Sequence, residues 1–79
     1  MELSNHALQR MRQRGITREQ VEETLRNERP FHYFHEGEWK VGYYNRSSGI
    51  FVSQVRGTIV TVITQVRAQY VENLRKGAP

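Results

Sequence analysis

The residues best suited to acid–base chemistry stand in the stretch HALQRMRQRG at positions 6–15. His6, Arg10 and Arg14 follow one another at intervals of four, so on a helix they would line one side. A histidine can take up or release a proton near neutral pH, and arginines hold phosphates through charge-assisted hydrogen bonds. This row is typical of a site that binds or cleaves a phosphate ester, although an ordinary solvated helix face has the same spacing.

Further candidates lie after Pro30, where aromatic, hydroxyl and basic side chains alternate. On one face of a sheet, Lys40 would hold a phosphate, the hydroxyls would donate hydrogen bonds, and the rings would stack unpaired bases. The alternative is the ordinary solvent side of an antiparallel sheet. The candidate substrate-binding residues are Arg14, Tyr33, His35, Tyr44 and Ser53, and Lys40 joins His6 and Arg10 as a candidate for the chemistry.

The sequence predicts no metal ion and no cofactor. His32 and His35 form an H-x-x-H pair, but a strand would place their rings on opposite faces. The chain has no cysteine, and it contains no glycine-rich phosphate loop and no G-x-S-x-G motif.

The composition fits one small basic domain. The 79 residues include 12 Lys and Arg against 8 Asp and Glu, a formal net charge of +4. This balance favours a polyanionic partner such as a nucleic acid. The longest apolar run, IVTVI, is too short to span a bilayer, and no signal-like start precedes it. We therefore expect no membrane contact and a cytoplasmic site of action.

Two helices are predicted before Pro30. Ser4 is suited to cap a helix over 4–15 that Gly15 ends, and Thr17 with Gln20 forms a capping box that opens a helix over 17–28.

After Pro30 the apolar residues repeat every second position, which predicts strands. We expect a type II′ turn at Gly37-Glu38, a loop over 46–49 and a tight turn at Arg56-Gly57. The expected strands are 31–36, 39–45, 50–55 and 58–66, within a sheet over 31–66, and a final helix covers 67–76. The fold class is α+β, with two N-terminal helices packed on a four-stranded antiparallel meander and a short C-terminal helix.

Pairing the strands through these turns sorts their side chains onto two faces. The face expected to pack against the helices carries Phe34, Trp39, Val41, Tyr43, Ile50, Val52, Ile59 and Ile63. The face expected to stay open and bind carries Phe31, Tyr33, His35, Lys40, Gly42, Tyr44, Phe51, Ser53, Val60, Val62 and Thr64.

The stretch HALQRMRQRGITREQVEETL, followed by a meander ending in IVTVIT, resembles the bacterial family called domain of unknown function 4258. The resemblance covers roughly residues 3–66, and its most specific part is the H-x-x-x-R-M-x-x-R-x-I spacing. That family is grouped with the barnase–EndoU–colicin–RelE (BECR) superfamily of metal-independent endoribonucleases. By resemblance, His6 and Arg10 match the signature, and Thr64 matches a polar position on the last strand.

The resemblance implies RNA cleavage by attack of the 2′-hydroxyl, which DNA lacks. It also implies an RNA substrate, an acidic immunity or antitoxin protein as a partner, and a gene that stands alone or forms the C-terminal tip of a larger secreted toxin. In such a site His6 would act as base or acid, and Arg10, Lys40 and Thr64 would contact the phosphate.

Two alternatives remain open from the sequence. The first is a nucleic-acid-binding module without catalysis, since two helices joined at RGIT resemble a helix-turn-helix, although the glutamates of 18–28 would repel DNA phosphates. The second is a protein-interaction domain whose aromatic and basic face meets an acidic partner.

Overall fold

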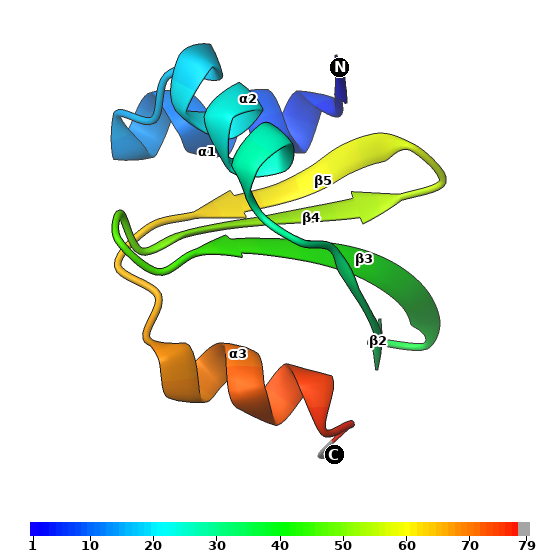
Figure 1. Cartoon of the computed structure of the whole chain (residues 1–79). Coiled ribbons are helices and arrows are strands. Elements are labelled where there is room, and N and C mark those ends of the chain that lie inside the picture. The colour runs from blue at the N-terminus through cyan, green and yellow to red at the C-terminus, as the bar shows by residue number, and fades with distance from the viewer. Residues whose placement is uncertain (78–79) are drawn as a thin grey trace.

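The computed structural model describes residues 1–77 and has the predicted α+β class. Two N-terminal helices, a β-meander and a short C-terminal helix follow one another as expected (Figure 1). The elements are β1 (Glu2–Leu3), α1 (Asn5–Arg14), α2 (Arg18–Asn27), β2 (Phe31–His35), β3 (Glu38–Asn45), β4 (Ile50–Val55), β5 (Thr58–Ile63) and α3 (Ala68–Arg75). The last strand ends at Ile63 rather than at position 66, because Thr64 and Gln65 bend away toward α3.

The two helix starts are capped as the sequence predicts. The Ala7 amide donates to Ser4 Oγ at 3.0 Å, and Gly15 ends α1 in the left-handed conformation, with φ of 66°. Thr17 and Gln20 form the capping box of α2, each accepting a hydrogen bond from the other's backbone amide at 3.1 and 2.9 Å. These local hydrogen bonds fix where both helices begin.

The sheet has five strands rather than four, in the order β1-β5-β4-β3-β2. Strands β2 to β5 form the predicted antiparallel meander. The additional strand β1 pairs parallel with β5 through Glu2 opposite Thr58 and Leu3 opposite Ile59. Two residues are too few to show a strand period, so the sequence pattern gives no sign of β1.

The first hairpin turn is displaced from its predicted place. His35 pairs with Glu38, so the turn residues are Glu36 and Gly37, not Gly37 and Glu38. Both have positive φ, 52° and 82°, which makes the turn type I′ rather than type II′. The turn at Arg56-Gly57 stands where predicted, with φ of 51° and 83°.

A β-bulge in β5 exchanges two side chains between the faces of the sheet. Ser53 pairs with Thr61 while Gln54 pairs with Ile59, so Val60 has no partner on β4. The extra residue reverses the alternation beyond it. Val62, expected on the open face, is therefore buried in the core, and Ile63, expected in the core, lies on the opposite face beside Phe51.

The helices cover both faces of the sheet. Helices α1 and α2 pack on one face, and α3 lies on the other (Figure 1). The first core consists of Ala7, Met11, Ile16, Val21, Ile50, Val52, Ile59 and Val62. The second consists of Tyr33, Phe51 and Val71, with Phe31, Tyr44, Ile63, Val66 and Leu74 packed against them. The expectation of one open binding face is wrong, because α3 buries its centre.

Two residues expected in the core are exposed. Phe34 and Trp39 are 54% and 66% accessible, and their rings meet edge to face at 5.5 Å between centroids. They pair across β2 and β3 at the hairpin end. None of the helices described in residues 1–77 has the length and apolar content that a bilayer-spanning helix requires.

Candidate nucleic-acid interface at the sheet edge

Helix α1 is fastened to β5 at both of its ends. At the start, the Ser4 amide donates to the Ile59 carbonyl at 2.9 Å, and at the end Arg14 Nη1 donates to the Val62 carbonyl at 3.1 Å. Between these points Ala7 and Met11 are buried against the sheet. The helix therefore has a fixed position over the outer part of β5.

The predicted row of polar side chains forms along α1. Arg10 Nε donates to His6 Nε2 at 3.4 Å, and Arg10 Nη1 donates to Gln13 Oε1 at 3.0 Å. His6, Gln13 and Arg14 are exposed, and Arg10 is half-buried. We call His6, Arg10, Gln13 and Arg14 the α1 row. Its hydrogen bonds hold one imidazole and one guanidinium next to each other, with the imidazole exposed.

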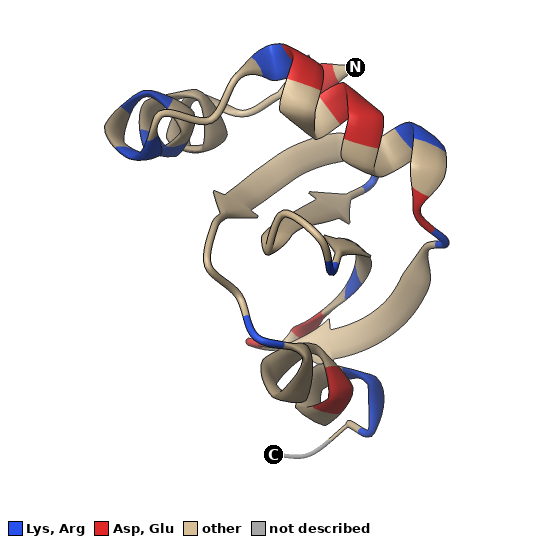
Figure 2. Cartoon of the chain, turned by 60° about the vertical axis from the view of Figure 1, so that its left-hand side comes forward, with Lys and Arg blue, Asp and Glu red and all other residues tan. Residues whose placement is uncertain are grey.

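The charge on the two N-terminal helices is segregated. Helix α1 carries three arginines and no acidic residue, whereas α2 carries three glutamates and two arginines. Figure 2 shows basic residues on α1 and acidic residues along α2, and the three glutamates of α2 are exposed. A polyanion is therefore attracted to α1 rather than to α2.

Thr64 lies near the same edge of the sheet. It follows β5 directly and stands two residues beyond Val62, whose carbonyl binds Arg14. Two residues of extended chain span about 7 Å. Of the predicted site residues in the second half of the chain, the half-exposed Thr64 is the one nearest in sequence to the carbonyl that holds Arg14.

Four other predicted site residues lie on the α3 side of the sheet, away from His6. Lys40 is only 9% exposed, and its ammonium contacts Glu36 Oε1 at 3.4 Å. The Tyr33 hydroxyl donates to Ser53 Oγ at 2.8 Å inside the second core. The Tyr44 hydroxyl donates to the Val66 carbonyl at 2.7 Å, which holds the segment after β5 in place. The expectation that these side chains share one crevice with His6 is wrong, because the sheet separates them.

His35 lies at the far edge of the sheet. It ends β2, which is separated from β5 by β3 and β4, about 14 Å at the usual strand spacing. Its Nε2 is 3.6 Å from Glu36 Oε1. His35 therefore belongs to the first hairpin and does not meet the α1 row.

The Tyr33 hydroxyl is held in its protonated form. Burial raises the pKa of Tyr33 above its ordinary value of 10.0, the hydrogen bond with Ser53 lowers it, and Tyr70 and Glu36 raise it. The burial effect is the largest, so Tyr33 stays a hydrogen-bond donor within the second core.

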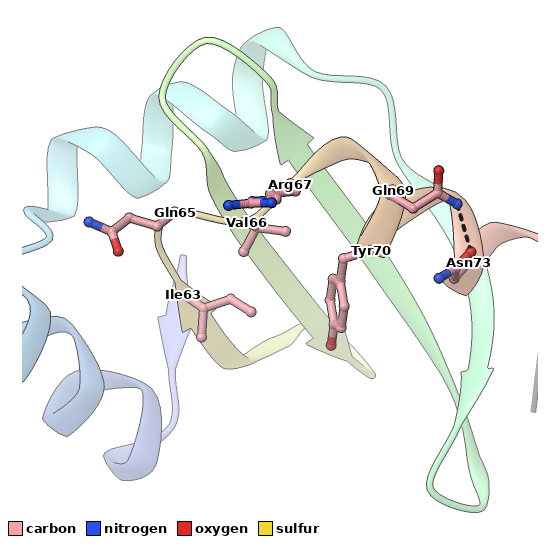
Figure 3. A pocket seen from close by; sticks show the side chains of 7 residues that line it. All are labelled: Ile63, Gln65, Val66, Arg67, Gln69, Tyr70 and Asn73. Carbon is pink, nitrogen blue, oxygen red and sulfur yellow. Dashed lines mark hydrogen bonds between the residues drawn. The ribbon is translucent and has the colours of Figure 1, made fainter.

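A groove lies between the end of β5 and α3, and the sequence interpretation missed it. Its volume is about 490 Å³, and it is lined by Ile63, Gln65, Val66, Arg67, Gln69, Tyr70 and Asn73. Figure 3 shows Ile63 and Tyr70 on its two sides, with Val66 and Arg67 between them. We call it the β5–α3 groove. The sequence signal for this groove was the position of Tyr70 between Gln69 and Asn73. The sequence interpretation considered only the apolar positions of this helix and therefore missed it.

Within residues 1–77, no three side chains of the histidine, cysteine or acidic type gather closely enough to hold a metal ion.

Comparison with known proteins gives one match. No curated protein and no solved structure matches the chain. One family model matches residues 3–70, which include the α1 row, the whole sheet from Leu3 onward and the start of α3. The chain therefore belongs to the family described as Domain of unknown function (DUF4258).

Proposed function

We propose that the chain is a metal-independent endoribonuclease whose site lies along the α1 row and the edge of β5. The observation that carries the proposal is the hydrogen-bonded pair of His6 and Arg10 on a helix that has three arginines and no acidic residue. It supplies an acid–base group next to a fixed cation, the two components that cleavage of a phosphodiester requires. The grouping with BECR ribonucleases that the resemblance implies agrees with this chemistry.

The proposed reaction is cleavage of the phosphodiester by the neighbouring 2′-hydroxyl. Arg10 turns its guanidinium from His6 Nε2 to the phosphate, and the freed Nε2 lone pair takes the proton of a ribose 2′-hydroxyl. The 2′-oxygen bonds to phosphorus, and the bond from phosphorus to the 5′-oxygen breaks. Arg10 and Arg14 stabilise the added negative charge, and Thr64 donates a hydrogen bond to the phosphate. The leaving oxygen takes its proton from solvent. The products are a 2′,3′-cyclic phosphate and a 5′-hydroxyl, and DNA is not cleaved. Lys40 takes no part, because it is buried on the other face.

The test is cleavage of a single-stranded RNA in EDTA by three proteins: the wild type, His6→Ala and His32→Ala. His32 is a matched control, because it is an exposed histidine on β2 near the far edge of the sheet. We expect His6→Ala to lose at least a hundredfold in rate, in line with the usual contribution of one acid–base group. His32→Ala should cleave like the wild type, and an all-DNA strand should stay intact.

Equal rates for wild type and His6→Ala would remove His6 from the mechanism. Circular dichroism of the variants separates a loss of chemistry from a loss of fold. Because His6 is exposed, its replacement should leave the helix signal unchanged.

A second candidate function is RNA binding without cleavage. One observation favours it: Lys40, which was expected to hold the phosphate, and His35, a candidate substrate-binding residue, both lie away from His6. In that case the wild type would retard RNA in a gel while the RNA termini stay intact.

Two further proposals follow from the same surface. An acidic immunity or antitoxin protein would compete with RNA for the arginines of α1, since both present negative charge. We propose a cytoplasmic site of action, reached either by a stand-alone protein or by a domain delivered within a larger secreted one.

A further inference from the structure

We infer that the β5–α3 groove receives one unpaired nucleobase of the RNA whose phosphates contact the α1 row. This inference rests on the proposed function and adds the form of RNA that is recognised. It assigns to Tyr70 the role of stacking surface and to the neighbouring amides the role of base readout.

The groove and the α1 row lie on opposite faces of the sheet and reach β5 at consecutive residues, Ile63 and Val62. Arg14 Nη1 binds the carbonyl of Val62, and the next residue, Ile63, lines the groove. Adjacent Cα atoms are 3.8 Å apart. An RNA strand that crosses this edge of the sheet can therefore place a phosphate beside Arg14 and an adjoining base in the groove.

The side walls of the groove suit a flat aromatic ligand. Tyr70 is 45% exposed, and its ring stands nearly perpendicular to that of Phe51, at 85° and 6.3 Å between centroids. This contact fixes the orientation of the Tyr70 ring and leaves part of the ring accessible to a ligand. Ile63 faces it across the groove (Figure 3). A base that enters would stack on the ring and contact aliphatic carbons on its other side.

The polar residues of the groove match the chemistry of a nucleotide. Gln65, Gln69 and Asn73 each carry an amide, which offers both donors and acceptors to a base edge. Gln69 Nε2 donates to Asn73 Oδ1 at 2.9 Å, so these two amides are already oriented. Arg67 is the charged residue of the lining, and no acidic residue lines the groove. The charge favours an anionic ligand.

The segment that forms the floor of the groove is held in place before any ligand arrives. The Val66 amide donates to the Gly49 carbonyl at 2.9 Å, and the Tyr44 hydroxyl donates to the Val66 carbonyl at 2.7 Å. Gln65 adopts a positive φ of 58°, which turns the chain from β5 toward α3. A base paired in a duplex has its edge occupied and both faces covered, so a base must be unpaired to enter.

The experiment measures binding of a fluorescein-labelled RNA octamer with 2′-O-methyl groups, which cannot be cleaved because the attacking hydroxyl is blocked. The proteins are wild type, Tyr70→Leu, Tyr70→Phe and Trp39→Ala. Trp39 is the matched control, because it is an exposed aromatic residue at the far hairpin, 66% accessible. Each protein is also tested against the same strand in duplex form and against an octamer with abasic sites.

We expect Tyr70→Leu to weaken binding of the single strand about five- to a hundredfold, which corresponds to the loss of one stacked base. Tyr70→Phe and Trp39→Ala should bind within about twofold of wild type. Wild type should bind the duplex and the abasic strand as weakly as Tyr70→Leu binds the intact strand. Leucine keeps an apolar contact with Phe51, and a urea titration verifies that the variant is folded.

Three results would overturn the inference: Tyr70→Leu binding like wild type, Trp39→Ala weakening as much as Tyr70→Leu, or equal wild-type affinity for intact and abasic strands. The proposed function fails separately, since it predicts cleavage that depends on His6. If cleavage depends on His6 but binding does not depend on Tyr70, the proposed ribonuclease function stands and the inference of a base site in the groove is refuted.

Discussion

At the scale of single residues, Tyr33 links burial, hydrogen bonding and pH. Its hydroxyl donates to Ser53 Oγ at 2.8 Å, and Ser53 is fully buried. Ionisation of Tyr33 would place a negative charge in the second core, and the hydrogen bond with Ser53 offsets only part of that cost. Burial accordingly raises the pKa of Tyr33 above 10.0 in the folded state.

We predict that Tyr33 makes the protein lose stability in alkaline solution. Because the folded-state pKa lies above the unfolded one, the stabilisation is fully present below about pH 10 and is lost as the pH rises through the folded-state pKa. Urea unfolding at pH 8 to 11 measures this loss. Tyr33→Phe should be less stable at pH 8 by about 1–2 kcal/mol, since it leaves the Ser53 hydroxyl without its partner.

The decline above pH 10 should be shallower in Tyr33→Phe than in wild type. Tyr43→Phe is the matched control, because Tyr43 is a half-buried tyrosine that packs against the first core instead. A Tyr33→Phe protein with the full alkaline decline would show that other groups cause it.

At the scale of elements, the features set by neighbouring residues could be predicted from the sequence. The caps at Ser4 and Thr17, the end of α1 at Gly15 and the turn at Arg56-Gly57 all stand where their residues indicate. Each depends on contacts within about four positions along the chain. The bounds of the helices and of β2 to β4 consequently agree with expectation to within one or two residues.

The features set by distant contacts could not be predicted in this way. β1 exists because Leu3 meets Ile59, more than fifty residues away in the chain. The bulge at Val60 and the docking of α3 on Phe51 and Tyr33 likewise depend on tertiary packing. A prediction based only on the alternation of side chains along β5 therefore assigned Val62 and Ile63 to the wrong faces of the sheet.

The two type I′ turns predict a stabilising substitution. Arg56 has φ of 51°, a conformation that costs an ordinary side chain about 1 kcal/mol but that asparagine tolerates. Arg56→Asn should raise the free energy of unfolding in urea by about 0.5–1 kcal/mol. Arg46→Asn is the control, because Arg46 lies in the loop after β3 and does not have a positive φ. Equal effects at both positions would refute the backbone explanation.

At the scale of the whole molecule, the sheet divides the predicted site. His6, Arg10 and Arg14 lie along α1 beside β5, and Thr64 follows the end of β5. Lys40, Tyr33, Tyr44 and Ser53 lie on the α3 side. The row on α1 could be predicted because four-residue spacing fixes one side of a helix. Its partners could not, because that required knowing which face of the sheet α3 covers.

The position of each arginine around α1 predicts which one would contact RNA in the proposed function. Arg10 belongs to the α1 row, whereas Arg12, two residues on, projects from the other side of the same helix. Arg10→Gln should weaken binding of the uncleavable octamer and reduce the slope of log K against log salt by about 0.7, the value for one phosphate contact on a single strand. Arg12→Gln removes the same charge and should leave the slope unchanged.

If both substitutions lower the slope equally, the RNA senses only the overall charge of α1 and has no defined path across it. A circular dichroism spectrum of each variant excludes helix loss as the cause.

The bulge at Val60 has one more consequence. That unpaired residue determines which face of the sheet each later side chain of β5 points to. As a result, Val62 packs in the first core and Ile63 packs in the second. Removing a single amino acid there would rotate the rest of the strand by half a turn. The carbonyl that anchors Arg14 and the side chain that walls the groove would then swap directions together. Deletion of one residue in a hairpin would thus disrupt both the α1 row and the groove, the two parts of the proposed RNA-binding edge.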